Sequence, residues 1–122
     1  MVTAPVLVVD DDADCRVMLA TLLECAGFPV ATAQDGRAAL AECRRQRPCL
    51  ILLDLMMPVM TGEAFRTEQL RDPLLAEIPV VIVSARHDAA QTARRLAAVG
   101  CNGKPIDADD LLHVVSEYCH VA

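Results

Sequence analysis

The sequence has few aromatic residues and almost no lysine. Tryptophan is absent, the aromatic residues are Phe28, Phe65 and Tyr118, and Lys104 is the only lysine among 11 lysine and arginine residues. The core must therefore be built mainly from aliphatic side chains. These are plentiful because 54% of the residues are hydrophobic, a content that argues against a disordered chain.

Long apolar runs and a targeting segment are also absent. The longest apolar runs, near Leu50–Leu53 and Pro79–Val83, have the length of strands, so no membrane span is expected. The first residues lack a basic stretch followed by an apolar stretch, so no signal peptide is predicted and a cytoplasmic location is expected. A formal net charge of −6 argues against nucleic-acid binding through the domain surface.

The six cysteines do not follow the spacing of a metal site. No CxxC pair occurs among Cys15, Cys25, Cys43, Cys49, Cys101 and Cys119, and their spacings match no zinc pattern. A chain of 122 residues can build its own core without cross-links. We therefore predict that the cysteines are buried free thiols.

Apolar runs of strand length alternate with helical segments along the chain. Strands are predicted at Val6–Val9, Val30–Ala33, Leu50–Leu53, Val80–Val83 and, very short, Cys101–Lys104. Helices are predicted at Asp14–Ala26, from Asp35 to about Gln46, at Glu63–Leu70, from Asp88 to Val99 with Gly100 closing it, and from Asp107 onward. This alternation predicts one α/β domain over residues 1–122, with a doubly wound parallel sheet of five strands in the order 2-1-3-4-5 and helices on both faces.

Polar side chains follow the carboxyl ends of four of these strands. They are Asp10, Asp11 and Asp12 after the first strand, Asp54 after the third, Ser84 after the fourth and Lys104 after the fifth. In a parallel sheet the carboxyl ends share one edge, where ligands bind. We therefore expect these side chains to lie close together.

Carboxylates that converge on one site repel each other and need a cation. Oxygen ligands favour Mg²⁺ or Ca²⁺, and Mg²⁺ in particular combines one or two carboxylates with phosphate oxygens. The Ser84 hydroxyl and the Lys104 ammonium would complete a pocket for a phosphoryl group, in which an aspartate can be the nucleophile. Asp54 is the best candidate, because it stands between Leu53 and Leu55 and a carboxylate there is costly without partners. Asp12 and Asp14 are better explained as helix caps.

Several segments resemble the response regulator receiver domain of two-component signalling. They are Val6-Leu-Val-Val-Asp10-Asp11-Asp12, Leu52-Leu53-Asp54-Leu55-Met56-Met57-Pro58 with Gly62, Val81-Ile-Val-Ser84-Ala85, and Lys104-Pro105. Each segment is short, but their order and spacing make the resemblance specific, and it covers essentially the whole chain. The fold implied by the resemblance is flavodoxin-like.

The resemblance also implies a role for each site residue. Asp54 is the phosphoacceptor, and Asp10 and Asp11 form the acidic pair that binds Mg²⁺, with Asp11 the more direct ligand. The backbone carbonyl of Met56 is a further metal ligand. Ser84 is similar to the switch hydroxyl and Lys104 to the lysine that pairs with the phosphoryl group, often after a cis peptide bond to the proline.

The resemblance further implies a switch and not an enzyme that turns over a separate substrate. The expected phosphodonor is a histidine kinase or a histidine phosphotransfer protein, and the output goes to a downstream protein that the sequence does not identify. Phosphorylation is expected to change a surface around the fourth helix, fifth strand and fifth helix, where dimerisation is also plausible.

One segment departs from the family pattern. Gly100-Cys-Asn-Gly-Lys104-Pro105 is compressed by about three residues, and Cys101 stands where the family has an aromatic residue. We expect a stunted fifth strand that leaves more of the fourth strand's edge exposed. The usual coupling through the aromatic side chain is not available. A further hypothesis is that Lys104 is displaced from the pocket.

Three alternatives belong to other functional classes. A degenerate receiver would bind a partner without phosphorylation. A haloacid-dehalogenase-like phosphatase would need a second aspartate two residues after the nucleophile, where this chain has Met56. A flavodoxin-like flavin protein would need a phosphate-binding loop after the first strand, where Asp10-Asp11-Asp12 would repel the phosphate.

Overall fold

The computed structural model describes residues 3–121, and its centre is a parallel sheet of five strands in the order β2-β1-β3-β4-β5. The strands are β1 (Val6–Val9), β2 (Val30–Ala33), β3 (Leu50–Leu53), β4 (Val80–Ser84) and β5 (Gly100–Gly103). The predicted fold and strand order are confirmed. All four residues of β1 pair with β2 on one side and with β3 on the other, so β1 and β3 lie inside the sheet.

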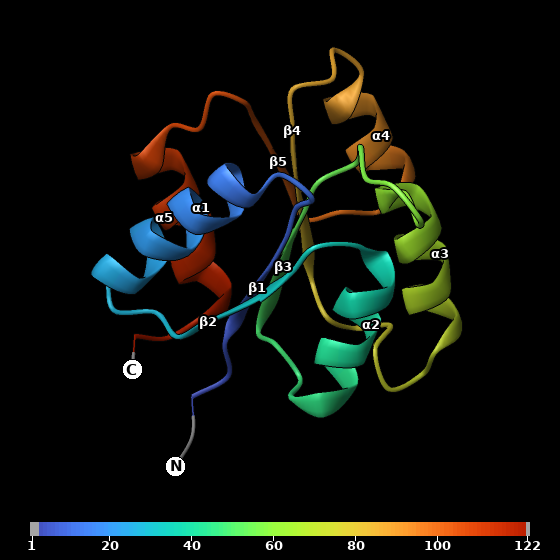
Figure 1. The fold of residues 1–122 in the computed structure, drawn as a ribbon, viewed down its shortest axis with the longest axis horizontal. Helices are drawn as coiled ribbons and strands as arrows, with labels where there is room; N and C mark the ends of the chain where they lie inside the picture. Colours follow the sequence, from blue (N-terminus) through green and yellow to red (C-terminus); the bar gives the residue numbers. More distant parts are fainter. Residues whose placement is uncertain (1–2, 122) are drawn as a thin grey trace.

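Five helices cover the two faces of the sheet (Figure 1). They are α1 (Ala13–Cys25), α2 (Gly36–Arg45), α3 (Gly62–Arg71), α4 (Ala89–Arg95) and α5 (Ala108–Tyr118). Helices α1 and α5 cover one face, and α2, α3 and α4 cover the other (Figure 1). No helix within residues 3–121 is long and apolar enough to span a membrane.

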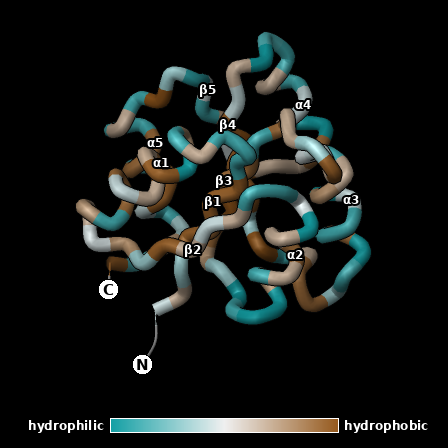
Figure 2. Tube along the Cα trace, in the orientation of Figure 1, coloured by the Kyte–Doolittle hydropathy of each residue, from teal (hydrophilic) through white to brown (hydrophobic). Residues whose placement is uncertain are grey.

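The strands are apolar on both sides because each face of the sheet packs against helices. Leu7 and Ile51 belong to the core cluster beneath α2, α3 and α4, whereas Val8 and Leu52 belong to the cluster beneath α1 and α5. The hydrophobic residues accordingly concentrate along the central strands in Figure 2. The core is aliphatic as predicted, with Phe65 the one aromatic side chain in the first cluster.

Most helices begin at a side chain that caps free backbone N–H groups. The carboxylates of Asp12, Asp35 and Asp107 and the hydroxyl of Thr61 accept hydrogen bonds from the first turns of α1, α2, α5 and α3. The prediction of a helix cap is therefore confirmed for Asp12 and wrong for Asp14, which lies in the first turn of α1. Asp88 is an exception, because its side chain does not cap α4 and binds Arg86 instead.

Helix α4 is shorter than the sequence predicts. The helix ends at Arg95, not at Val99, and Gly100 belongs to β5 and does not close the helix. Two features of the backbone end the helix early. Ala97 adopts a φ of 56°, and the backbone N–H of Val99 already donates to the carbonyl of Val80 in the sheet.

Strand β5 is short, as predicted, but it does not leave the edge of β4 exposed. Its four residues pair with Val81 to Ser84, and all five residues of β4 are buried. The expectation of an exposed β4 edge is therefore wrong. The segment is shorter than the family pattern, but its residues from Gly100 to Gly103 still pair with β4.

The prediction of buried free thiols is wrong for most of the cysteines. Cys49 and Cys119 form a disulfide across a sequence separation of 70 residues, with their Cα atoms 5.5 Å apart. The fold brings the residue before β3 beside the residue after α5, a proximity that no local spacing could signal. Of the four free cysteines, Cys43 is buried and Cys15 is half-buried, whereas Cys25 and Cys101 are exposed.

Candidate functional site

Three carboxylates meet at the carboxyl edge of the sheet. The pairing of Val9 with Leu53 places the ends of β1 and β3 side by side, and the backbone N–H of Asp54 donates to the carbonyl of Val9 at 3.0 Å. Each of Asp10, Asp11 and Asp54 offers a carboxylate oxygen within 4.8 Å of the others. Asp10 and Asp54 are buried and Asp11 is exposed, so the group has one open side.

Lys104 lies among these carboxylates. Its Nζ is 2.9 Å from Oδ2 of Asp10 and 3.9 Å from Oδ2 of Asp54. The hypothesis that the compressed segment displaces Lys104 is therefore wrong. The backbone explains why, because β5 keeps its register up to Gly103 and the N–H of Lys104 donates to the Ser84 carbonyl at 3.2 Å. The peptide bond between Lys104 and Pro105 is cis, as the family resemblance implies.

Burial and charge shift the pKa values of the two buried acids in opposite directions. Burial raises the pKa of Asp54 to about 6, because the nearby Lys104 ammonium only partly offsets the loss of solvent. Burial also acts on Asp10, but hydrogen bonds from Lys104 and from the backbone N–H of Asp12 outweigh it and hold its pKa below the ordinary value. Burial lowers the pKa of Lys104, but the hydrogen bond to Asp10 and the charge of Asp54 leave it raised.

The remaining predicted site residues lie at the same edge. Ser84 ends β4 and is buried, and its Oγ accepts a hydrogen bond from the backbone N–H of Arg86 at 3.2 Å. The N–H of Met56 donates to Oδ1 of Asp54 at 3.3 Å, which ties the following loop to the carboxylate. Gly62 is needed for close packing here, since a Cβ at this position would lie 2.6 Å from the backbone oxygen of Asp54.

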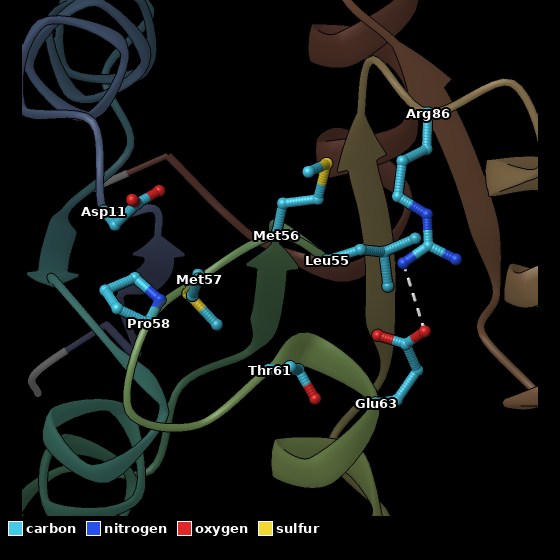
Figure 3. A pocket seen from close by; sticks show the side chains of 8 residues that line it. All are labelled: Asp11, Leu55, Met56, Met57, Pro58, Thr61, Glu63 and Arg86. Atoms are coloured by element: carbon cyan, nitrogen blue, oxygen red, sulfur yellow. Dashed lines mark hydrogen bonds and ion pairs between the residues drawn. The ribbon is translucent and has the colours of Figure 1, made fainter.

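An open cavity of about 570 Å³ adjoins the carboxylates. It is lined by Asp11, Leu55, Met56, Met57, Pro58, Thr61, Glu63 and Arg86. Asp11 and Pro58 lie on one side of it and Arg86 and Glu63 on the other, with the Met56 side chain between them (Figure 3). A group bound to Asp11 would therefore face Arg86.

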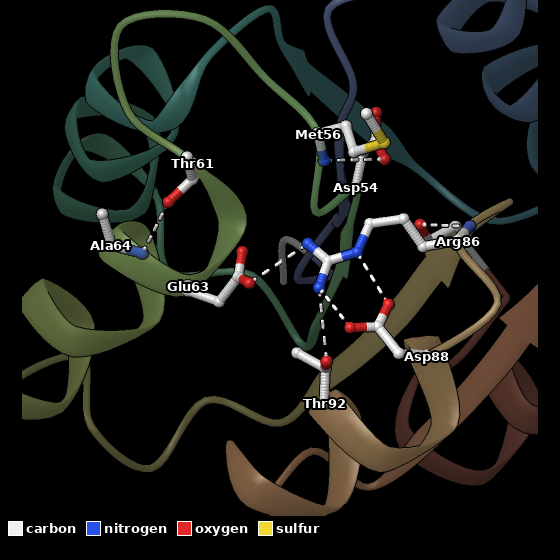
Figure 4. Close-up of polar contacts among 9 residues, drawn as sticks. Asp54, Met56, Thr61, Glu63, Ala64, Arg86, Asp88 and Thr92 are labelled. Carbon is white, nitrogen blue, oxygen red and sulfur yellow. Dashed lines mark hydrogen bonds and ion pairs between the residues drawn. The ribbon is translucent and has the colours of Figure 1, made fainter.

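The sequence reasoning missed Arg86 and its partners. The Arg86 guanidinium donates to both carboxylate oxygens of Asp88, at 2.9 and 2.8 Å, and to Glu63 at 3.1 Å (Figure 4). Arg86 stands two residues after Ser84, in the loop that follows the carboxyl end of β4. Its position therefore carried a signal, because loops at this edge of a parallel sheet supply ligand-binding residues.

The donor set at this edge suits a hard divalent cation. Asp10, Asp11 and Asp54 offer oxygen atoms, which Mg²⁺ prefers, and the exposed side of the group leaves room for water and phosphate oxygens. A cation would also relieve the repulsion from Asp10, which adds to the effect of burial in raising the pKa of Asp54. The Lys104 ammonium adds a second positive group beside the same carboxylates. The residues present therefore fit Mg²⁺ together with a phosphoryl group.

Comparison with known families gives one match over most of the chain. Residues 6–116 match the model of the response regulator receiver domain. Among curated proteins, the transcriptional regulatory protein PrrA of Mycobacterium tuberculosis is 46% identical over 86 residues, which cover 70% of this chain and 36% of PrrA. An uncharacterized 14.6 kDa protein of Leptolyngbya boryana is 33% identical over 93% of this chain and 88% of its own length.

Solved structures agree with the family match. The chemotaxis protein CheY4 of Vibrio cholerae superposes with a TM-score of 0.86 and is 32% identical, over 96% of this chain and 99% of that one. The receiver domain of NtrX from Brucella abortus gives a TM-score of 0.84 at 32% identity, over 93% and 96%. The chain spans between a third and a half of the length of several curated regulators that it matches.

Proposed function

Because this chain belongs to the response regulator receiver family, we propose that residues 1–122 form one receiver domain that accepts a phosphoryl group on Asp54 in a Mg²⁺-dependent reaction. The observation that carries the proposal is the placement of the Lys104 ammonium within 3.9 Å of Asp54, beside three carboxylates that can share a cation. A binding module with no phosphoryl chemistry has no need for this arrangement.

Each side chain has a proposed role in the transfer. An oxygen of Asp54 attacks phosphorus, an O–P bond forms, and the bond between phosphorus and the donor breaks with its electron pair on the donor. Asp10, Asp11, Asp54 and the Met56 carbonyl would hold Mg²⁺, which supplies positive charge beside the phosphoryl oxygens. Lys104 and the Ser84 hydroxyl would bind the remaining phosphoryl oxygens.

The pKa of Asp54 makes the cation important for this reaction. A nucleophilic carboxylate must be ionised, and burial raises the pKa of Asp54 to about 6 in the metal-free site. Positive charge from Mg²⁺ favours the ionised form. Bound Mg²⁺ would therefore extend the ionised, nucleophilic form of Asp54 to lower pH, in addition to supplying positive charge beside the phosphoryl oxygens.

The family membership suggests the proposed partners and the class of output. The phosphodonor is a histidine kinase or a histidine phosphotransfer protein, and the receiver is a cytoplasmic signalling switch whose own chemistry is limited to gaining and losing the phosphoryl group. PrrA is named as a transcriptional regulatory protein and CheY4 as a chemotaxis protein, so receivers of this kind serve different outputs. The downstream protein of this chain stays open, and a dimer is compatible with the proposal.

The degenerate receiver is the second candidate, and the structure removes one reason for it. That alternative was motivated by the compressed segment before Lys104, yet Lys104 reaches both Asp10 and Asp54. The missing aromatic residue at Cys101 remains in its favour, since the usual route for signal output is lost.

The test is intact mass after incubation with acetyl phosphate and Mg²⁺. We expect one phosphoryl adduct on the wild type and none on Asp54→Asn. The matched control is Asp12→Asn, which changes an exposed acid of the same edge and keeps a side chain that caps helices equally well. The control should be labelled like the wild type. If the wild type gains no adduct while another receiver is labelled in parallel, the degenerate reading replaces this proposal.

A further inference from the structure

Arg86 lies between the proposed phosphoryl pocket and the start of α4. Its backbone N–H donates to Oγ of Ser84 at 3.2 Å, and its side chain lines the same cavity as Asp11 and Met56. The residue is therefore linked to Ser84 through its main chain, and its side chain borders the cavity beside Asp11. Figure 4 shows the guanidinium extending from the end of β4 toward α3, below Asp54 and Met56.

The Arg86 guanidinium joins α3 to the beginning of α4. It forms a bidentate pair with Asp88, directly before α4, and an ion pair with Glu63 in the first turn of α3. Its Nη2 is also 3.5 Å from Oγ1 of Thr92, one turn into α4. The pair lowers the pKa of Asp88 to about 2, as expected for a carboxylate held by an arginine. Because the Asp88 carboxylate binds Arg86, it does not cap the first backbone N–H groups of α4.

The other end of α4 is held in a different way. Arg66 of α3 is buried, and its Nε and Nη2 donate to the backbone carbonyls of Leu96 and Ala97 at 2.9 and 3.1 Å. Its Nη1 donates to the side-chain oxygen of Gln69, which is itself fully buried. Buried hydrogen bonds are costly to break. Helix α4 is therefore anchored at its carboxyl end by the buried Arg66 and at its amino end by the partly buried Arg86.

We propose that Arg86 transmits the phosphorylation of Asp54 to α4. The inference rests on the proposed function of Asp54. A phosphoryl group on Asp54 would bring about two negative charges and strong acceptor oxygens beside the cavity that Arg86 lines together with Asp11 and Met56. These oxygens compete for the guanidinium and for the Ser84 hydroxyl, and Arg86 then leaves Asp88 and Glu63. The exchange is feasible because charge-assisted hydrogen bonds to phosphoryl oxygens can replace those to the carboxylates of Asp88 and Glu63, which are only partly buried.

The consequence is a pivot of α4 about a fixed end. Departure of Arg86 removes the link that joins Glu63 of α3 to Asp88 at the start of α4, whereas Arg66 keeps Leu96 and Ala97 in place. This route requires no aromatic side chain on β5. It therefore gives a receiver with Cys101 at that position a way to change its α4 surface on phosphorylation.

The test is amide hydrogen exchange of α4 with and without phosphorylation, with the adduct followed by intact mass in the same sample. In the wild type we expect the amides of the first turns of α4 to exchange roughly threefold or more faster once Asp54 carries the phosphoryl group. In Arg86→Gln we expect these amides to exchange at the same rate in both states. In Asp88→Asn, which leaves Arg86 in place, we expect the difference between the states to shrink.

The matched control is Arg94→Gln, which changes an arginine of the same helix that forms no ion pair within residues 3–121. This variant should respond to phosphorylation like the wild type. If Arg86→Gln or Asp88→Asn, carrying the adduct, shows the same acceleration as the control, the role of Arg86 is overturned and the phosphoacceptor function stands. If the wild type takes no phosphoryl group, both proposals are overturned.

Discussion

Reducing the disulfide between Cys49 and Cys119 should lower the stability of the domain substantially. The cross-link joins residues 70 positions apart, so it encloses more than half of the 122 residues in one loop. Closing a loop of this length in the unfolded chain corresponds to about 4 kcal/mol of conformational entropy at 25 °C. Reduction leaves the native contacts of the fold in place, so most of this effect acts on the unfolded state.

Urea unfolding followed by circular dichroism, with and without dithiothreitol, measures the effect. With a urea m-value of about 1–3 kcal/mol/M, the midpoint should fall by at least about 1 M on reduction. The double variant Cys49→Ala with Cys119→Ala should show no response to the reductant. Cys25→Ala, which removes an exposed free thiol, should keep the full response.

A shift below about 0.3 M, with both thiols shown to be reduced by mass, would refute this reasoning. It would mean that packing alone holds the residue before β3 against the end of α5. In that case Cys119, which is 3% exposed, would stabilise the domain as a buried thiol and not as a cross-link.

Three further predictions concern the acidic pocket and the loop beside it. Burial raises the pKa of Asp54 from 3.8 to about 6, so the folded state binds the carboxyl proton more tightly than the unfolded state. The resulting stabilisation of the folded state is complete below pH 3.8 and is lost as the pH rises through 6. In metal-free urea titrations, Asp54→Asn should therefore be more stable than the wild type by roughly 2–3 kcal/mol above pH 7 and equally stable near pH 3.5. Equal stability of the two proteins at both pH values would contradict the shifted pKa. Mg²⁺ at ten times its dissociation constant should stabilise the wild type by about 1.4 kcal/mol, and Asp11→Asn should lose this gain in thermal unfolding; an unchanged gain would exclude Asp11 as a ligand. Val59 has a φ of 69° and is 77% exposed, so Val59→Gly should raise the free energy of unfolding by up to about 1 kcal/mol, and a loss of stability would show that the backbone there is not strained.

The sequence predicted those parts of the site that depend on strand ends. Asp10, Asp54 and Ser84 each follow or end an apolar run, and a parallel sheet brings the carboxyl ends of its strands to one edge whatever the details of the helices. Helix starts were equally accessible, because Asp35 and Asp107 accept hydrogen bonds from N–H groups only three residues away. Local patterns of this kind are visible in a sequence.

The features that the sequence did not predict depend on residues far apart in the chain. Helix α4 ends early where Arg66, 30 residues before Leu96, takes the carbonyl of that residue. The disulfide joins cysteines 70 residues apart. The hypothesis that Lys104 is displaced was wrong for the same reason, because its position depends on the pairing of β5 with β4 and not on the number of residues before it. Hydrophobic periodicity and the spacing of residues in the sequence do not report contacts between distant residues.

The single lysine gives the domain an unusual chemical property. Lys104 carries the only side-chain amine of the chain, and that amine sits among the carboxylates of the pocket with 24% of its side chain exposed. Acylation at a side-chain amine can therefore occur only where it also removes the charge that pairs with Asp10 and Asp54. The raised pKa keeps the amine protonated and slow to react while those acids are ionised. Acylation of Lys104 and its ion pairs with Asp10 and Asp54 are thus mutually exclusive states of one nitrogen atom.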